Sequence, residues 1–257
     1  MKLKHIYIIL LLAVFSAAKA QPPGFMGKRF LVTANVGPSL AFPFNSYGSD
    51  AGFKFKPKLG LTTEYVVNRK TTVIFQYNYS STKLSVSSYL KDPFYNDFTE
   101  LGTHPAAVHN SSINFKYARH INGNLPAPLG FYWGHGVGIG IAGFVDKEGA
   151  FTNENGKAKN GTYLTSILPN LYSFIGNRRA IGKKLMLGFN MEFNWWGMIY
   201  MGLNFDYDPY FSNTGTVDLS SKTTGQFQHM INKNATKQAY YYSNMINLSL
   251  DITFLPF

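Results

Sequence analysis

The sequence predicts an all-β fold: an antiparallel up-and-down transmembrane β-barrel of about eight strands, with short periplasmic turns and long extracellular loops. Three observations lead to this prediction. Segments of about ten residues alternate between apolar and polar side chains. The polar faces of these segments carry few charges, and the connections between the segments alternate between short and long. Together these features are typical of a small membrane barrel.

The clearest alternation runs from Leu185 to Trp195. There the odd positions are Leu, Leu, Phe, Met, Phe and Trp, whereas the even positions include Gly, two Asn and Glu. The same two-residue period recurs at 58–67, 73–80 and 246–254. A period of two is that of a β-strand, because successive side chains of a strand point to opposite faces of the sheet.

The composition of the polar faces distinguishes a barrel from a soluble β-sandwich, which also alternates. Sandwich strands are usually about five or six residues long, and Lys and Glu are common on their water-facing side. Here the polar faces are mostly Gly, Asn, Ser, Thr and Gln, and five glycines share one face between Leu129 and Phe144. Small side chains suit a narrow lumen, and aromatic residues near the strand ends are typical of membrane interfaces. We therefore favour the barrel over a periplasmic or secreted sandwich.

The order of strands and connections gives the predicted topology. Strands are predicted near 29–42, 56–67, 71–83, 109–119, 129–145, 161–175, 184–203 and 239–255. Short connections rich in turn-forming residues are predicted at 68–70, 121–128 and 176–182, and longer polar ones at 43–55, 84–108, 146–160 and 204–238. Single-chain bacterial barrels have an even number of strands and place their short turns in the periplasm. A further hairpin around 223–231 would raise the number of strands to ten.

Residues 1–20 have the pattern of a secretory signal peptide, which leaves 21–257 as one outer-membrane barrel domain. Two lysines precede an apolar stretch, and a small-x-small cleavage site ends at Ala20. The chain has a net charge of +11, and removal of the three lysines in 1–20 lowers it to +8. A net charge this positive suggests a nucleic acid as the partner, but an exported protein does not encounter nucleic acid. The chain has no cysteine, which excludes disulfides, thiolate metal sites and cysteine nucleophiles.

Charged residues on the strands point into the predicted lumen. Away from the strand ends there are five of them, all on polar faces: Lys58, Glu64, Lys116, Glu192 and Asp251. Eight strands leave an interior just wide enough for side chains. Because an unpaired buried charge is costly, we expect opposite charges to pair, to plug the lumen and to prevent porin-like conduction.

The remaining charges divide between the two ends of the predicted barrel. Ten of the 13 acids lie in the long loops, and none lies in a short turn. Nine cations gather at the predicted periplasmic end and form what we call the basic rim: Lys28, Arg29, Arg69, Lys70, Arg119, Arg178, Arg179, Lys183 and Lys184. We expect this rim to bind anionic headgroups of outer-membrane lipid or an acidic periplasmic or envelope protein partner.

The chain resembles the small eight-stranded outer-membrane barrels of the OmpA-transmembrane-domain and OmpX type. Its Ala20-Gln21 junction, its segment Gly24-Phe-Met-Gly-Lys-Arg-Phe30 and its Phe257 are similar to those of Bacteroidota barrels of the porin-family or PorT-like type. The resemblance implies a Gram-negative outer-membrane location and insertion by barrel assembly machinery. It also implies a non-enzymatic role as a structural or interaction subunit, such as an accessory part of a secretion or assembly complex. A small porin or transport barrel, or a lipid-modifying barrel enzyme, is the alternative.

The enzyme-like patterns in the sequence have simpler explanations. Residues 138–143 fit a dinucleotide-binding glycine motif but lie inside a predicted strand, not at the start of a helix. The histidines after residue 20 include no i, i+4 pair, so we expect neither a metal site nor a cofactor. His135 and Ser173 are conceivable members of a lipid-facing triad like that of lipid A deacylases, but no acid lies close in register. We therefore expect no enzymatic activity.

Overall fold

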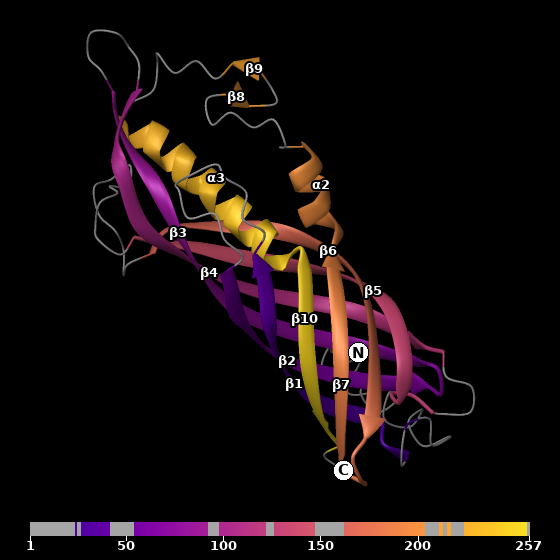
Figure 1. Cartoon of the computed structure of the whole chain (residues 1–257). Coiled ribbons are helices and arrows are strands. Elements are labelled where there is room, and N and C mark those ends of the chain that lie inside the picture. The colour runs from indigo at the N-terminus through magenta and orange to yellow at the C-terminus, as the bar shows by residue number, and fades with distance from the viewer. Residues whose placement is uncertain are drawn as a thin grey trace, which may run out of the picture.

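Eight long strands close into one antiparallel barrel (Figure 1). The computed structural model describes residues 24, 27–41, 54–91, 98–121, 126–146, 162–203, 211–212, 215–216 and 224–255. The barrel strands are β1 (Phe30–Ala41), β2 (Lys54–Asn68), β3 (Thr71–Lys91), β4 (Phe98–His120), β5 (Gly130–Asp146), β6 (Thr162–Ala180), β7 (Leu185–Asn194) and β10 (Ile246–Phe254). Consecutive strands of the barrel pair with each other, and β1 pairs with β10 to close it. The prediction of an eight-stranded up-and-down barrel is confirmed.

The two faces of the strands follow the predicted alternation. On β7, Leu187 and Phe189 are exposed on the outer wall, whereas Asn190 and Glu192 are buried in the lumen. The outer wall is apolar around the whole barrel, and Ile167 on β6 is 73% exposed there. Large exposed apolar surface of this extent is unfavourable in water and suits a lipid environment.

Two of the predicted strands are partly helical, because β7 and β10 end their pairing at the same level. The last backbone hydrogen bond there runs from Asn194 N to Met245 O at 2.8 Å. Beyond it the chain forms α2 (Trp195–Leu203) on one side and α3 (Thr224–Asn244) on the other. The predicted strand bounds 184–203 and 239–255 are therefore wrong at those ends. A strand needs a hydrogen-bonded neighbour, whereas a helix satisfies its own backbone.

The helix α3 also replaces the extra hairpin considered around 223–231. Its buried residues Phe227, Ile231 and Ala235 recur every four positions, which is the spacing of one helical face. A separate two-stranded sheet consists only of β8 (Phe211–Ser212) and β9 (Gly215–Thr216) and takes no part in the barrel. The barrel therefore keeps eight strands.

Three strands extend beyond their predicted bounds by five residues or more. Most of the predicted loop 84–108 belongs to a long hairpin of β3 and β4, whose register continues to the pair Lys91 and Phe98. At the other end of the barrel, β6 continues to Ala180, so that the turn before β7 spans 181–184 instead of 176–182. The extension of β6 changes the orientation of one predicted rim residue, as shown below.

The short connections gather at one end of the barrel, which we call the short-turn end (Figure 1). The long β3–β4 hairpin and both helices lie at the other end, which we call the helix end. No helix in the described part of the chain is long and apolar enough to cross a membrane. The predicted signal peptide and its cleavage site after Ala20 lie outside the described residues, as do nearly all of the predicted loops 43–55 and 146–160.

Candidate functional site

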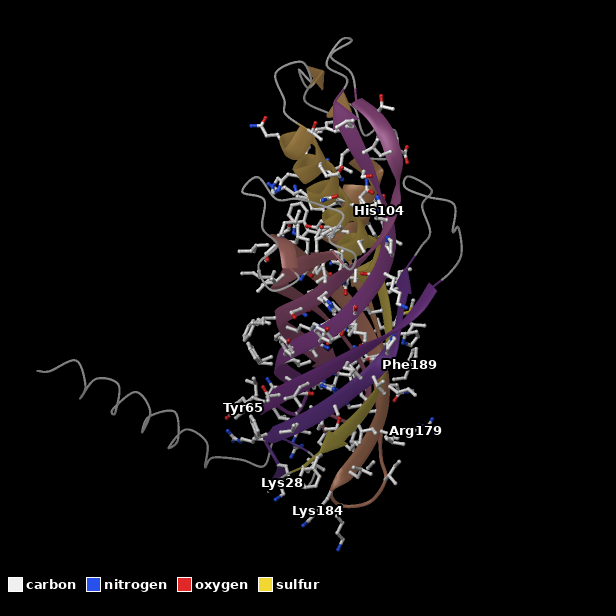
Figure 2. All side chains as sticks on the ribbon, turned by 90° about the vertical axis from the view of Figure 1, so that its left-hand side faces the viewer. Lys28, Tyr65, His104, Arg179, Lys184 and Phe189 are labelled. Carbon is white, nitrogen blue, oxygen red and sulfur yellow. The ribbon has the colours of Figure 1, made fainter. Side chains whose placement is uncertain are left out.

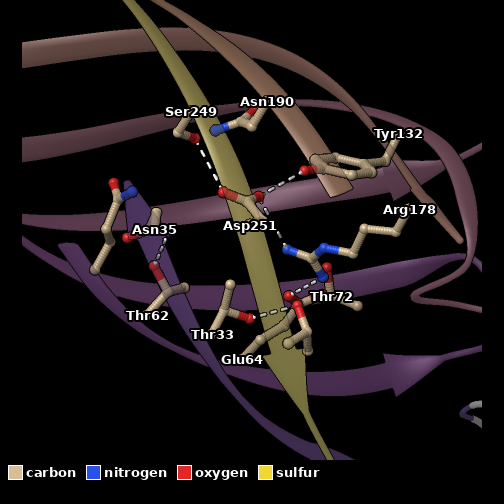
Figure 3. A network of polar contacts seen from close by, with 12 residues as sticks. Thr33, Asn35, Thr62, Glu64, Thr72, Tyr132, Arg178, Asn190, Ser249 and Asp251 are labelled. Carbon is tan, nitrogen blue, oxygen red and sulfur yellow. Dashed lines mark hydrogen bonds and ion pairs between the residues drawn. The ribbon is translucent and has the colours of Figure 1, made fainter. Parts of the chain in front are cut away.

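Arg178 is at the centre of the first ion-pair network in the lumen (Figure 3). Its Nη1 donates a hydrogen bond to Glu64 Oε2 at 2.5 Å, and its Nη2 lies 4.0 Å from Asp251 Oδ2. Asp251 also accepts hydrogen bonds from Ser249 Oγ at 2.9 Å and from the Tyr132 hydroxyl at 3.5 Å. The guanidinium carbon lies 5.1 Å from the centre of the Tyr132 ring. Side chains from β2, β5, β6 and β10 thus meet at one charged cluster.

Glu192 is at the centre of a second network. Lys116 Nζ lies 2.6 Å from Glu192 Oε1, which also accepts hydrogen bonds from Asn190 Nδ2 at 2.8 Å and Gln76 Nε2 at 3.3 Å. Lys58 is buried, and its Nζ has no hydrogen-bond partner among the described residues. It lines a small polar cavity together with Glu192 and Gln76, a setting that suits ordered water. The structure therefore places all five predicted lumen charges inside the barrel and brings four of them into ion pairs.

Arg178 corrects the predicted basic rim. Because β6 continues through Ala180, position 178 keeps the inward parity of Phe174 and Gly176, and its side chain is only 4% exposed. The rim prediction for this residue is therefore wrong. With Arg178 inside, the charges of the described lumen balance, because three cations face three carboxylates. The predicted set had only two cations for the same three carboxylates.

Glycines provide the space for these networks. A Cβ atom at Gly176 would overlap the Tyr132 ring, and one at Gly136 would lie 2.5 Å from Lys116 Cγ. Because glycine has no side chain, the ring and the lysine stem can lie flat against the barrel wall. The glycine-rich inner face of β5 thus allows large side chains to fit inside eight strands.

Apolar clusters close the lumen at both ends. At the short-turn end, a buried cluster contains Leu31, Val66, Ala127, Leu129, Met186 and Leu255. At the helix end, the α3 residues Phe227, Ile231 and Tyr240 pack against inward residues of β3 to β6, including Val86 and Phe144. The charged networks lie between these two apolar clusters.

Tyr240 attaches α3 to the barrel interior. Its hydroxyl lies 2.7 Å from Asn170 Nδ2 and 2.9 Å from Asn170 Oδ1. The hydroxyl also rests on Gly140, where a Cβ atom would overlap it. Near it, Asn110 Nδ2 donates to Ser243 Oγ at 3.2 Å. These hydrogen bonds and the close contact with Gly140 therefore hold the helix in place, in addition to the apolar packing.

Substitution of Gly140 by Leu should loosen α3 without unfolding the barrel. The new side chain would displace the Tyr240 ring from its position against residue 140, because inserted volume in a packed interior forces neighbouring side chains to move. We expect faster amide hydrogen exchange along α3, measured by mass spectrometry, while the barrel strands stay protected. Ile139→Leu, which changes the neighbouring outward position, is the control. Unchanged exchange in α3 would show that the helix does not depend on this contact.

The other eight residues of the basic rim are exposed or half-buried and lie in or next to the short turns. Figure 2 shows three of them, Lys28, Arg179 and Lys184, at the short-turn end. Backbone hydrogen bonds connect the segments that carry them: Val66 N donates to Arg29 O at 2.7 Å, and Leu255 N donates to Lys184 O at 3.1 Å. Arg29 Nη1 also donates to the Tyr65 hydroxyl at 3.2 Å. The short turns contain no Asp or Glu. This end of the molecule is therefore a concentrated positive surface, and it can attract anionic groups.

His135 and Ser173 are neighbours on the outer wall. His135 Nδ1 lies 2.8 Å from Ser173 Oγ, which also accepts a hydrogen bond from Trp195 Nε1 at 2.7 Å. A triad needs a carboxylate to orient the histidine, and the buried carboxylates of the described strands, Glu64, Glu192 and Asp251, face the lumen instead. No group of three or more metal-ligating side chains occurs within the described ranges.

Two functional features escaped sequence reasoning. The inward position of Arg178 follows from parity once the length of β6 is known, but 176–182 contains enough turn-forming residues to suggest an early end. The role of α3 as a seal could have been found from the four-residue spacing of Phe227, Ile231 and Ala235. That Tyr240 meets Asn170 has no signal in the sequence.

The closed barrel, its apolar wall and its charged, sealed lumen define a small β-barrel of the outer-membrane type. No family model matches the sequence, and no curated protein is significantly similar to it. Among solved structures, the chain is similar to Ail, the attachment invasion locus protein of Yersinia pestis, in complex with the heparin analogue sucrose octasulfate. The alignment has 10% identity and a TM-score of 0.35, and it covers 88% of this chain and 93% of that chain.

Proposed function

We propose that this protein is a non-conducting outer-membrane barrel that acts as a structural or interaction subunit of the cell envelope. The observation that carries the proposal is the sealed lumen, which is filled by paired charges and closed at each end by an apolar cluster. A barrel without a passage acts through its outer surfaces. We place the short-turn end in the periplasm, as is usual for such barrels. Barrel assembly machinery would insert the chain, and no cofactor is required.

The basic rim is the proposed binding surface. Eight cations without an acid in the short turns would repel one another unless anionic groups screen them. Two sources fit this chemistry: phospholipid headgroups of the inner leaflet and an acidic periplasmic or envelope protein partner. An accessory role in a secretion or assembly complex is the proposed use of the second source. The relationship to PorT-like barrels of Bacteroidota stays a prediction from the sequence.

The purified protein should not conduct ions in planar lipid bilayers. The buried pairs Lys116–Glu192 and Arg178–Glu64 occupy the lumen, and α3 fills its mouth. We expect only the baseline current across a range of voltages, with a known porin measured in parallel as the positive control. Steady porin-like conductance would contradict the proposal and would favour the alternative of a small transport barrel.

Removal of rim charges should weaken binding at the short-turn end while the barrel stays folded. The variant Arg179→Gln, Lys183→Gln, Lys184→Gln keeps Arg178, whose loss would disturb the lumen. We expect lower recovery of protein partners from detergent extracts at low salt, with a loss that matches the effect of high salt on the wild type. Binding to vesicles with and without anionic phospholipid then distinguishes a lipid from a protein source.

A different result would move the functional surface to the helix end. If the rim variant keeps its partner and its affinity for anionic vesicles, while shortening of the β3–β4 hairpin abolishes partner recovery, the rim is not the binding surface. The control for charge removal in general is Lys83→Gln on the exposed side of β3.

A lipid-modifying enzyme is the second candidate function. The hydrogen bond between His135 and Ser173 on the outer wall favours it, since a nucleophile and a base lie within reach of each other. We place it second because the described outer wall supplies no acid near the histidine, and because the Trp195 indole N–H already donates a hydrogen bond to the serine oxygen.

A further inference from the structure

The helix α2 (Trp195–Leu203) lies at the end of β7 and contains no charged side chain. Its sequence, WWGMIYMGL, contains no polar side-chain group other than the tyrosine hydroxyl and the two indole N–H groups. A surface helix of a soluble protein has a polar face towards water. This helix has none, so its exposed side needs an apolar environment.

Packing distinguishes two sides of α2. One side contacts α3: the Tyr200 and Tyr241 rings are 4.9 Å apart, and a Cβ atom at Gly197 would lie 3.3 Å from Tyr241 O. The other side carries the four large side chains that remain between 40% and 45% exposed: Trp195, Trp196, Met198 and Ile199. With 3.6 residues per turn, these four form one continuous apolar face.

The exposed face of α2 continues the outer wall of the barrel. Phe193, the last outward residue of β7, is followed two positions later by Trp195, whose indole nitrogen donates to Ser173 Oγ on the outer wall of β6. Ser173 in turn lies 2.8 Å from His135 on β5. These polar groups satisfy one another within the wall. The indole N–H therefore has its hydrogen bond without water, as burial against lipid requires.

We propose that α2 is an interfacial helix whose exposed face lies in the lipid leaflet at the helix end of the barrel. The occupant is lipid, because the face is continuous with a wall that lipid already covers in the proposed function, on which this inference rests. Tryptophan suits this place, since its ring prefers the boundary between acyl chains and headgroups. Through Tyr200 and Tyr241, the same helix connects the membrane surface with the α3 seal.

The absence of cysteine allows a direct test by site-specific spin labelling. Ile199→Cys is labelled with a nitroxide in the full-length protein in phosphatidylcholine vesicles, and its accessibility to oxygen and to a water-soluble nickel chelate is measured. Ile139→Cys on the outer wall of β5 is the lipid control, and Glu100→Cys on the exposed β3–β4 hairpin is the water control. We expect the oxygen-to-nickel accessibility ratio at Ile199 to exceed that at Glu100 several-fold and to approach that at Ile139.

Each other outcome has a distinct meaning. A ratio at Ile199 equal to that at Glu100 would overturn the proposal, because the face would then contact water. Low accessibility to both reagents would also overturn it, because a protein surface, such as a second copy of the chain, would cover the face. An aqueous ratio at Ile139 would instead contradict the membrane location and, with it, the proposed function.

A second measurement uses tryptophan fluorescence and needs no label. The chain has three tryptophans, so Trp133→Phe with Trp195→Phe leaves Trp196 as the only one. We expect its emission to be quenched more strongly by lipids brominated close to the headgroup than by lipids brominated near the chain ends. Quenching by aqueous iodide but not by either lipid would overturn the proposal.

Discussion

Replacement of Arg178 by Leu is expected to destabilise the barrel by about 3–5 kcal/mol, because it leaves two carboxylates buried without a positive partner. Glu64 is 1% exposed and Asp251 is 2% exposed, and Arg178 is the cation that contacts both. The measurement is heat modifiability: folded barrels migrate faster on gels than unfolded chains, and the temperature at which the fast band disappears reports stability. We expect this midpoint to fall markedly.

The matched control is the adjacent residue. Arg179→Leu removes the same charge one position along the chain, but its side chain points outward at the short-turn end (Figure 2). It should leave the midpoint almost unchanged, because an exposed charge contributes little to stability. Addition of Glu64→Gln and Asp251→Asn to Arg178→Leu should recover part of the loss, since no unpaired charge then remains. Equal effects of Arg178→Leu and Arg179→Leu would contradict the buried network.

Replacement of Glu192 by Leu is the second change with a large expected effect. Glu192 is the carboxylate that contacts Lys116, and Lys58 lines the same small cavity. Its loss leaves the buried lysines Lys58 and Lys116 near each other without a carboxylate between them, so we expect a penalty of about 3–5 kcal/mol and a lower gel midpoint. Glu100→Leu, at an exposed position of β4, should have almost no effect.

A double variant isolates the ion pair. If Glu192 and Lys116 interact as their 2.6 Å separation indicates, the combined change to Leu at both positions should cost less than the sum of the single changes. Strict additivity would show that the two residues are independent, and that Glu192 acts through its hydrogen bonds to Asn190 and Gln76 alone.

The barrel and its lumen could be predicted from the sequence because strand parity is a local property. In a strand, the side of the sheet on which a residue lies depends only on its distance from its neighbours along the chain. Lys58, Glu64, Lys116, Glu192 and Asp251 were therefore placed in the lumen by counting, and the structure buries all five. The choice between eight and ten strands was left open by these counts, and helix α3 in place of the extra hairpin decided it.

Only the tertiary structure decided where strands end, because a strand ends where its partner does. β7 stops at Asn194 because β10 begins just after Met245, and neither limit is visible in the alternation of one segment. The extra length of β6 moved Arg178 from the rim into the lumen and balanced its charges. The contact between Tyr240 and Gly140 joins two residues that lie far apart in the chain. The sequence by itself therefore determined the class of the barrel and most of its interior, whereas the ion-pair partners and the seal by α3 depend on how distant segments pack.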